Sequence, residues 1–215
     1  MYERVIKRIF DFLIGIIALP FILVITVIVA PLIYIDNKGP IFYNACRLGK
    51  DGKVFKMYKF RSMVVNAPDI RNEDGSTYNG DDDPRVTKVG RILRKTSIDE
   101  LPQFLNVLLG DMSLIGPRPD PLDDMKIYTE HQKKKLAVRP GITGYNQAYY
   151  RNSVEQNAKF EHDVYYAEHI SFILDMKIFF KTIVTVLSRD NVYNGVTELG
   201  QEEKKKVEDM RNKNV

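Results

Sequence analysis

Two adjacent carboxylates, Asp99 and Glu100, stand in the segment SIDELPQ (97–103), just before an apolar run. Ser97 and Glu100 have the spacing of a capping box, in which the two side chains bond the first turn of a helix. Pro102 conflicts with that arrangement, because proline favours the first helical position and would start the helix near residue 102. We therefore expect the acids in an irregular turn, where an ionised aspartate near cations can act as a nucleophile or a metal ligand. Helix capping alone stays open as the structural alternative.

Cationic side chains occur in settings that suit recognition of an anion. The segment GPRP places Arg118 between two prolines, which restrict the backbone and leave the guanidinium little entropy to lose on binding. Arg139 in VRPG also stands directly before a proline, and the guanidinium fork suits bidentate binding of phosphate. Lys59 and Arg61 would share one face of a strand, either as its polar face or as cations directed at a ligand.

A second acidic group, Asp81 to Asp83, contains the Asp-x-Asp pattern that many nucleotide-sugar glycosyltransferases use to hold a divalent metal. Residues 66–84 are rich in Asn, Asp, Gly and Pro and read as an exposed loop, with no apolar strand before the acids. A solvated acidic turn is therefore the favoured interpretation of this group.

The elements that would position these residues can be outlined from hydrophobic period and turn signals. Residues 41–63 predict a short hairpin around the turn Gly49-Lys50-Asp51-Gly52. Helical or amphipathic stretches are expected at Arg85–Lys95, Gln103–Leu109, Met125–Leu136 and, as one or two helices, Phe160–Leu187. The segment 138–147 is rich in turn residues, and the fold class is α/β, mostly helical with a short hairpin and amphipathic surface helices.

The chain begins with an apolar segment: residues 12–35 carry no charge. As a straight helix they would span roughly 36 Å, enough to cross a bilayer core. Pro20 should break this helix into two arms that are each too short to cross. Basic residues lie near both ends, which favours the cytoplasm for both flanks and hence a re-entrant hairpin over a spanning helix; these residues are Arg4, Lys7 and Arg8 before the segment and Lys38, Arg47 and Lys50 after it.

Composition sets the remaining limits. The 215 residues are 44% hydrophobic and 28% charged with a net charge of +4, which fits a folded chain that binds anionic lipid or phosphorylated ligands and does not argue for nucleic acid. A single cysteine, Cys46, excludes an intramolecular disulfide. We expect a membrane helix at 1–37, a catalytic domain at 38–200 and a charged tail at 201–215.

Three segments in this order after an apolar start resemble the bacterial sugar transferases, and more narrowly the small monotopic phosphoglycosyl transferases. They are KFRSM, DDPRVTKVGRILRKTSIDELPQFLNVLLGDMSLIGPRP and VRPGITGYNQ. The resemblance implies transfer of a sugar-1-phosphate from a UDP-sugar to polyprenyl phosphate, with release of UMP and a requirement for Mg²⁺. It also implies a bacterial inner-membrane protein with its catalytic domain on the cytoplasmic face.

The resemblance also implies roles for individual residues. Asp99 would attack the sugar-linked phosphate and carry a covalent phosphosugar, and Glu100 would assist the metal or a proton transfer. Lys59 and Arg118 match functional cations of the family, and Arg139 would contact phosphate.

Further substrate contacts are expected from Arg94, Arg61 and Gln147, and Mg²⁺ ligands from Asp99 and Glu100. Many family members carry Ser-Pro at the membrane break, whereas this chain has Leu19-Pro20. The expected partners are a UDP-sugar, polyprenyl phosphate and membrane lipid, and a homodimer is left open. Two alternatives remain: a metal-dependent glycosyltransferase that releases UDP, and a membrane-anchored scaffold without catalysis.

Overall fold

The computed structural model describes residues 2–71, 78, 80, 82–150 and 154–188. Within these residues the protein is mostly helical, with two small two-stranded sheets. The predicted charged tail, residues 201–215, and the end of the predicted catalytic domain lie outside the described residues.

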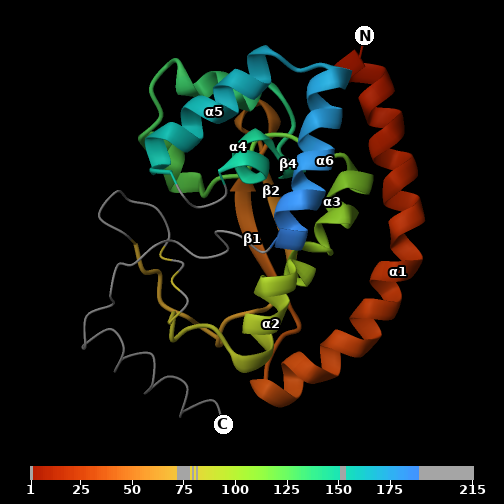
Figure 1. Ribbon diagram of the computed structural model, residues 1–215. Helices are drawn as coiled ribbons and strands as arrows, with labels where there is room; N and C mark the ends of the chain where they lie inside the picture. The colour runs from red at the N-terminus through yellow and green to blue at the C-terminus, as the bar shows by residue number, and fades with distance from the viewer. Residues whose placement is uncertain (1, 72–77, 79, 81, 151–153, 189–215) are drawn as a thin grey trace.

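The apolar segment forms one long helix. After a π-helical turn at Tyr2–Ile6, α1 runs from Lys7 to Asp36, continuing through Pro20 and Pro31. It descends along one side of the molecule and curves beneath it toward α2 (Figure 1). The predicted break at Pro20 is therefore wrong for this structure. Residues of α1 before and after Pro20 pack on the rest of the protein, which holds the chain in a single curved helix.

One face of α1 is buried and the rest is apolar and exposed. The buried positions recur at spacings of four and seven residues, as expected for one side of a helix: Lys7, Asp11, Gly15, Ile22, Val29 and Ile33. Val29 and Ile33 share a hydrophobic cluster with Phe60 and Leu93. Side chains such as Phe21 and Val27 stand 66% and 76% exposed, so the outer face of the helix indicates membrane association.

The predicted hairpin is confirmed. Strands β1 (Phe42–Leu48) and β2 (Val54–Phe60) pair antiparallel around a turn at Lys50–Gly52, with Phe42 opposite Phe60 and Leu48 opposite Val54. Asp51 and Gly52 both have positive φ, which the Asp-Gly pair tolerates in a tight turn. The hairpin lies at the centre of the molecule (Figure 1).

Of the two helices around SIDELPQ, the second has its predicted bounds and the first begins three residues later than predicted. Helix α2 spans Lys88–Thr96 and α3 spans Gln103–Leu109. The Thr87 hydroxyl caps α2 by accepting from Gly90 N at 2.9 Å. A Cβ at Gly90 would lie 1.9 Å from the Ser62 carbonyl oxygen, so only glycine allows α2 to approach the end of β2 this closely.

The second half of the chain covers the hairpin. A parallel pair, β3 (Ser113–Ile115) and β4 (Gly141–Thr143), is followed by the helices α4 (Tyr145–Tyr149), α5 (Gln156–Glu168) and α6 (Phe172–Ser188). The expected helical region after residue 160 is thus two helices. The polar helix expected at Met125–Leu136 is instead two separate 3-10 turns, Leu122–Lys126 and Gln132–Ala137. Asp124 and Lys135, one in each turn, are buried.

Candidate active site

The acidic pair lies in a short turn between two helices. Asp99 and Glu100 belong to a 3-10 turn at Ile98–Glu100, and α3 begins after Pro102, as the proline predicted. Ser97 adopts a positive φ of 58° and makes no side-chain cap, so the capping-box interpretation is wrong. The Glu100 side chain, which that interpretation would use for capping, points instead to cations from distant parts of the chain.

Four predicted residues meet at this turn. Lys59, at the end of β2, places Nζ 2.7 Å from Glu100 Oε1 and 3.9 Å from Asp99 Oδ2. Arg118, in the loop after β3, donates from its guanidinium to the same Glu100 oxygen at 3.3 Å. The four side chains come from three segments: Lys59 lies 41 residues before Glu100, and Arg118 lies 18 residues after it. We call Lys59, Asp99, Glu100 and Arg118 the catalytic cluster.

The two acids of the cluster differ electrostatically. Burial alone would raise the pKa of Glu100, but the charges of Lys59 and Arg118 outweigh it and lower the pKa to about 2. Burial raises the pKa of Asp99 above its ordinary value, and Lys59 only partly offsets this effect. Glu100 is therefore an ionised partner for two cations. The negative charge of Asp99 is less fully balanced by nearby cations.

Asp99 is available for chemistry. Its side chain is 10% exposed, and within the described part of the chain its carboxylate accepts no hydrogen bond from another residue. The carboxylate thus keeps lone pairs for an electrophile or a metal ion. Asp99 and Glu100 fit Mg²⁺, which binds proteins through one or two carboxylates and completes its shell with water and substrate phosphates. The described residues hold no group of three or more acidic, His or Cys side chains that would form a metal site by themselves.

Other predicted site residues lie near the cluster or away from it. Arg94 on α2 donates to the Ser62 hydroxyl at 3.0 Å, and its charge acts on Asp99. Arg139 donates to the Gly110 carbonyl at 2.9 Å, at the C-terminal end of α3. Gln147 on α4 has a buried amide with no hydrogen-bond partner among the described residues, and no contact joins it to the acids.

Arg61 is the clearest departure from the predicted site. Strand β2 ends at Phe60, so Arg61 leaves the strand alternation and is only 5% exposed. Its guanidinium donates to the Pro40 carbonyl at 2.6 Å and to the backbone carbonyl and side-chain oxygen of Asn37. Arg61 therefore holds the backbone of the segment that follows α1. Within the described residues, no hydrogen bond or ion pair joins it to the catalytic cluster.

The second acidic group also differs from the expectation. Asp83 is fully buried and bonds Arg85 through both carboxylate oxygens, at 2.9 and 2.8 Å, while Asp82 accepts from the Tyr78 hydroxyl at 2.6 Å. A solvated turn is therefore wrong for Asp83, and a metal would have to compete with its buried ion pair. Asp81 lies outside the described residues.

Sequence reasoning missed a buried network behind Arg118. Lys135, 2% exposed, places Nζ 2.5 Å from both Asp120 Oδ2 and Asp163 Oδ2, and the Tyr128 hydroxyl donates to the same Asp120 oxygen at 2.5 Å. Asp120 follows GPRP directly, so this network fixes the loop that carries Arg118. The sequence shows Lys135 only as one of three consecutive lysines, which gives no sign of its burial.

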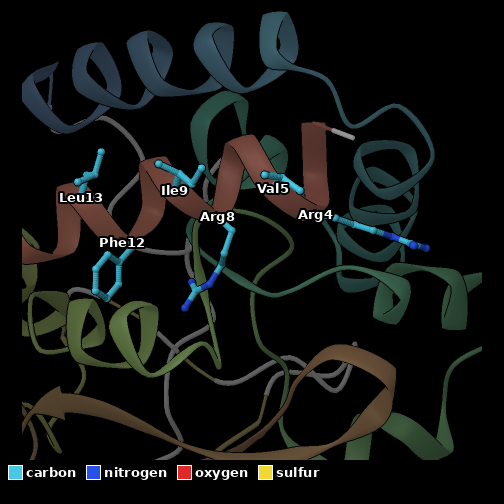
Figure 2. Close-up of a pocket in the computed structure, with 6 residues that line it drawn as sticks. All are labelled: Arg4, Val5, Arg8, Ile9, Phe12 and Leu13. Carbon is cyan, nitrogen blue, oxygen red and sulfur yellow. The ribbon is translucent and has the colours of Figure 1, made fainter.

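A surface hollow of about 370 Å³ lies elsewhere, along the first turns of α1. Figure 2 shows its lining residues, with the Arg8 side chain directed away from Ile9 and Leu13. Arg8 donates to the Val107 carbonyl at 2.8 Å. No member of the catalytic cluster lines this hollow, which is a separate and mainly apolar feature.

Comparison with known proteins finds relatives that match most of this chain. The chain is 42% identical over 188 residues to the uncharacterized sugar transferase EpsL of Bacillus subtilis, covering 87% of this chain and 90% of EpsL. It is 42% identical over 189 residues to a UDP-N-acetylgalactosamine-undecaprenyl-phosphate N-acetylgalactosaminephosphotransferase of Aeromonas hydrophila. It is 40% identical over 208 residues to the undecaprenyl-phosphate galactose phosphotransferase of Salmonella typhimurium.

The extent of these matches differs. The alignments cover 85% and 89% of this chain but only 44% and 42% of the Aeromonas and Salmonella proteins, so the chain spans less than half the length of these two relatives. The family model described as bacterial sugar transferase matches residues 2–189, which include α1 and every residue of the catalytic cluster. The chain therefore belongs to the bacterial sugar transferase family.

Proposed function

We propose that the protein transfers a sugar-1-phosphate from a UDP-sugar to polyprenyl phosphate, releasing UMP and forming a polyprenyl-diphosphate sugar. One observation carries the proposal: Asp99 is a buried carboxylate without a hydrogen-bond partner in the described structure, beside Lys59 and a Glu100 that is already paired. The names of the Aeromonas and Salmonella relatives support sugar-phosphate transfer to an undecaprenyl carrier.

The first step is attack of an Asp99 carboxylate oxygen on the sugar-linked phosphorus of the UDP-sugar. A bond forms from that oxygen to phosphorus, and the bond from phosphorus to the bridging oxygen breaks, so that UMP departs with the bonding electron pair. The product is an acyl phosphate, in which the Asp99 carboxyl is joined to the phosphorus of the sugar-1-phosphate. Lys59 and Arg118 stand where they can stabilise the negative charge that the transferring phosphoryl group carries.

The second step restores the enzyme. A phosphate oxygen of polyprenyl phosphate attacks the same phosphorus, forms the new diphosphate bond and displaces the Asp99 carboxylate. The covalent relay lets two anionic substrates visit the site in turn and avoids crowding them together. Mg²⁺ held by Asp99 and Glu100 would supply Lewis-acid stabilisation of the phosphate charge.

We also propose that α1 enters the membrane and returns to the cytoplasmic face, with lipid against its exposed side. Both ends of α1 are bonded to the same folded domain. Near its start, Lys7 pairs with Asp175 at 2.6 Å, and at its end the Asp36 carboxylate accepts from Val89 N at 2.8 Å. A helix that spans the bilayer would carry its two ends to opposite sides, where one domain could not hold both.

The nucleotide product tests the activity. Purified full-length protein is incubated with undecaprenyl phosphate, Mg²⁺ and a panel of UDP-sugars, and the released nucleotide is identified. We expect UMP with at least one sugar. Release of UDP would support the glycosyltransferase alternative, and no release with any sugar would support the scaffold alternative.

Cysteine labelling tests the topology. Glu3→Cys and Lys38→Cys, each in a Cys46→Ser background, are treated in sealed vesicles with a reagent that cannot cross the membrane. We expect both sites to react from the same side. Labelling from opposite sides would contradict the re-entrant arrangement.

A further inference from the structure

Arg47 on β1 stands on the side of the hairpin that faces the catalytic cluster. Cross-strand partners in an antiparallel pair point to the same side of the sheet. Tyr43 is opposite Lys59, Ala45 is opposite Met57, and Arg47 is opposite Phe55, so Arg47 shares a face with Lys59. Met57 and Phe55 pack with Val107 of α3, which shows that this face is directed at the α3 side.

The neighbouring backbone brings Arg47 to the loop that carries Arg118. Leu48 N donates to the Asp120 carbonyl at 3.0 Å, which ties the end of β1 to the residue two positions after Arg118. A small cavity at this junction is lined by Leu48, Gly49, Pro117 and Arg118. Arg47 is therefore the residue of β1 directly before the junction with the loop that carries Arg118.

Arg47 has no fixed partner within the described residues. Its side chain is half-buried, yet it forms no hydrogen bond and no ion pair there. The nearest acids are engaged elsewhere: Asp120 accepts from Tyr128 and Lys135, and Asp124 accepts from Gln156 at 3.2 Å. The guanidinium of Arg47 therefore keeps its N–H donors available for an anionic ligand or for water.

Electrostatics agree with this placement. Burial lowers the pKa of Arg47, the positive charge of Arg118 lowers it further, and Tyr43, Asp120 and Asp124 act in the opposite direction. Three cations, Lys59, Arg94 and Arg118, act on Asp99, and Arg47 adds a fourth positive charge beside Arg118. The excess of positive charge suits a ligand with several negative charges.

We propose that Arg47 binds a phosphate group of the substrate, next to Arg118. The proposal rests on the proposed function and adds a phosphate-binding residue to it. The phosphate belongs either to the nucleotide diphosphate or to the lipid acceptor, and both present the same chemistry to a guanidinium.

The experiment uses the full-length protein with Mg²⁺ and two probes. UDP reports on the nucleotide through its dissociation constant measured by calorimetry, and undecaprenyl phosphate reports on the acceptor through its KM. Arg47→Gln removes the charge. Lys56→Gln is the matched control, because Lys56 is an exposed cation on the opposite face of the same hairpin, across from Cys46.

We expect Arg47→Gln to weaken one of the two interactions by about tenfold or more, while Lys56→Gln changes both by less than about twofold. A weaker UDP complex assigns the phosphate to the nucleotide, and a higher KM for undecaprenyl phosphate assigns it to the acceptor. Arg47→Lys keeps the charge and the alkyl stem but loses the fork, so it should show a smaller loss of about threefold.

Thermal unfolding shows whether each variant is folded. If Arg47→Gln is not folded, Arg47→Lys is used as the test variant in its place. If wild-type protein releases UMP and the folded Arg47 variants keep both constants unchanged, the proposal for Arg47 is overturned while the proposed function stands. If wild-type protein neither binds UDP nor releases UMP, the proposed function itself fails.

Discussion

Lys59 hydrogen-bonds Glu100 and not Asp99: its Nζ lies 2.7 Å from Glu100 Oε1 and 3.9 Å from Asp99 Oδ2, in a short and a long ion pair. Arg118 donates to the same Glu100 oxygen. The second acid of the pair therefore anchors two cations beside the first. This arrangement leaves Asp99 in a longer ion pair with Lys59 and without a hydrogen bond among the described residues, which suits a nucleophile that must approach an anionic substrate.

Neutralising each acid should give different results. Asp99→Asn removes the proposed nucleophile and should lower sugar-phosphate transfer by at least about a thousandfold with little change in unfolding temperature. Glu100→Gln leaves the nucleophile but frees Lys59 and Arg118, so a smaller loss of about a hundredfold is expected. The measurement is the rate of UMP release. Equal losses in both variants would contradict this division of roles.

Removing Lys59 should change the pH dependence. Burial raises the pKa of Asp99, and Lys59 opposes that effect, so Lys59→Met should raise this pKa further. Because the nucleophile must be ionised, activity falls as the pH drops through this pKa, and the acid limb of the pH–rate profile should move to higher pH by about one unit or more. Lys59→Arg keeps the charge and should leave the limb in place. An unmoved limb in active Lys59→Met would count against the assignment.

The buried network behind Arg118 should matter for stability. Lys135→Met leaves Asp120 and Asp163 buried without their cation and should lower the free energy of unfolding by about 3–5 kcal/mol. The neighbouring Lys134 pairs with Glu168 at the surface, so Lys134→Met should cost less than about 1 kcal/mol. Denaturant unfolding compares the two variants. Similar small losses would mean that the network contributes little.

Arg61 should act on stability and not on substrate binding. Its guanidinium holds Asn37 and the Pro40 carbonyl, so Arg61→Met should lower the free energy of unfolding by about 2–3 kcal/mol. The KM for the UDP-sugar, measured on folded protein, should stay within about twofold of wild type. A large rise in KM with an unchanged free energy of unfolding would instead show that Arg61 contributes to substrate binding.

Local sequence rules located the acidic pair well. Pro102 correctly predicted where α3 begins, and the turn before this helix contains Asp99 and Glu100. Turn residues and alternation likewise predicted the hairpin that carries Lys59. These features depend on backbone preferences within a few residues of each position, so they can be read from the chain directly.

The remaining features depend on partners that are distant in sequence. Arg61 finds Asn37, 24 residues earlier, and Lys135 finds Asp163, 28 residues later. Arg47 looked like one more basic residue after the apolar segment, and only its register opposite Phe55 brings it onto the same face as Lys59. Such pairings leave no periodic pattern in the local sequence, because tertiary packing determines them.

The most direct test of the account is a single-turnover experiment without the lipid acceptor. Full-length protein is mixed with Mg²⁺ and a UDP-sugar that supports turnover, and the digested protein is examined by mass spectrometry. We predict a burst of UMP close to one equivalent per active site and a phosphosugar attached to Asp99, both absent in Asp99→Asn. UMP release that begins only when undecaprenyl phosphate is added, with no adduct on Asp99, would contradict it.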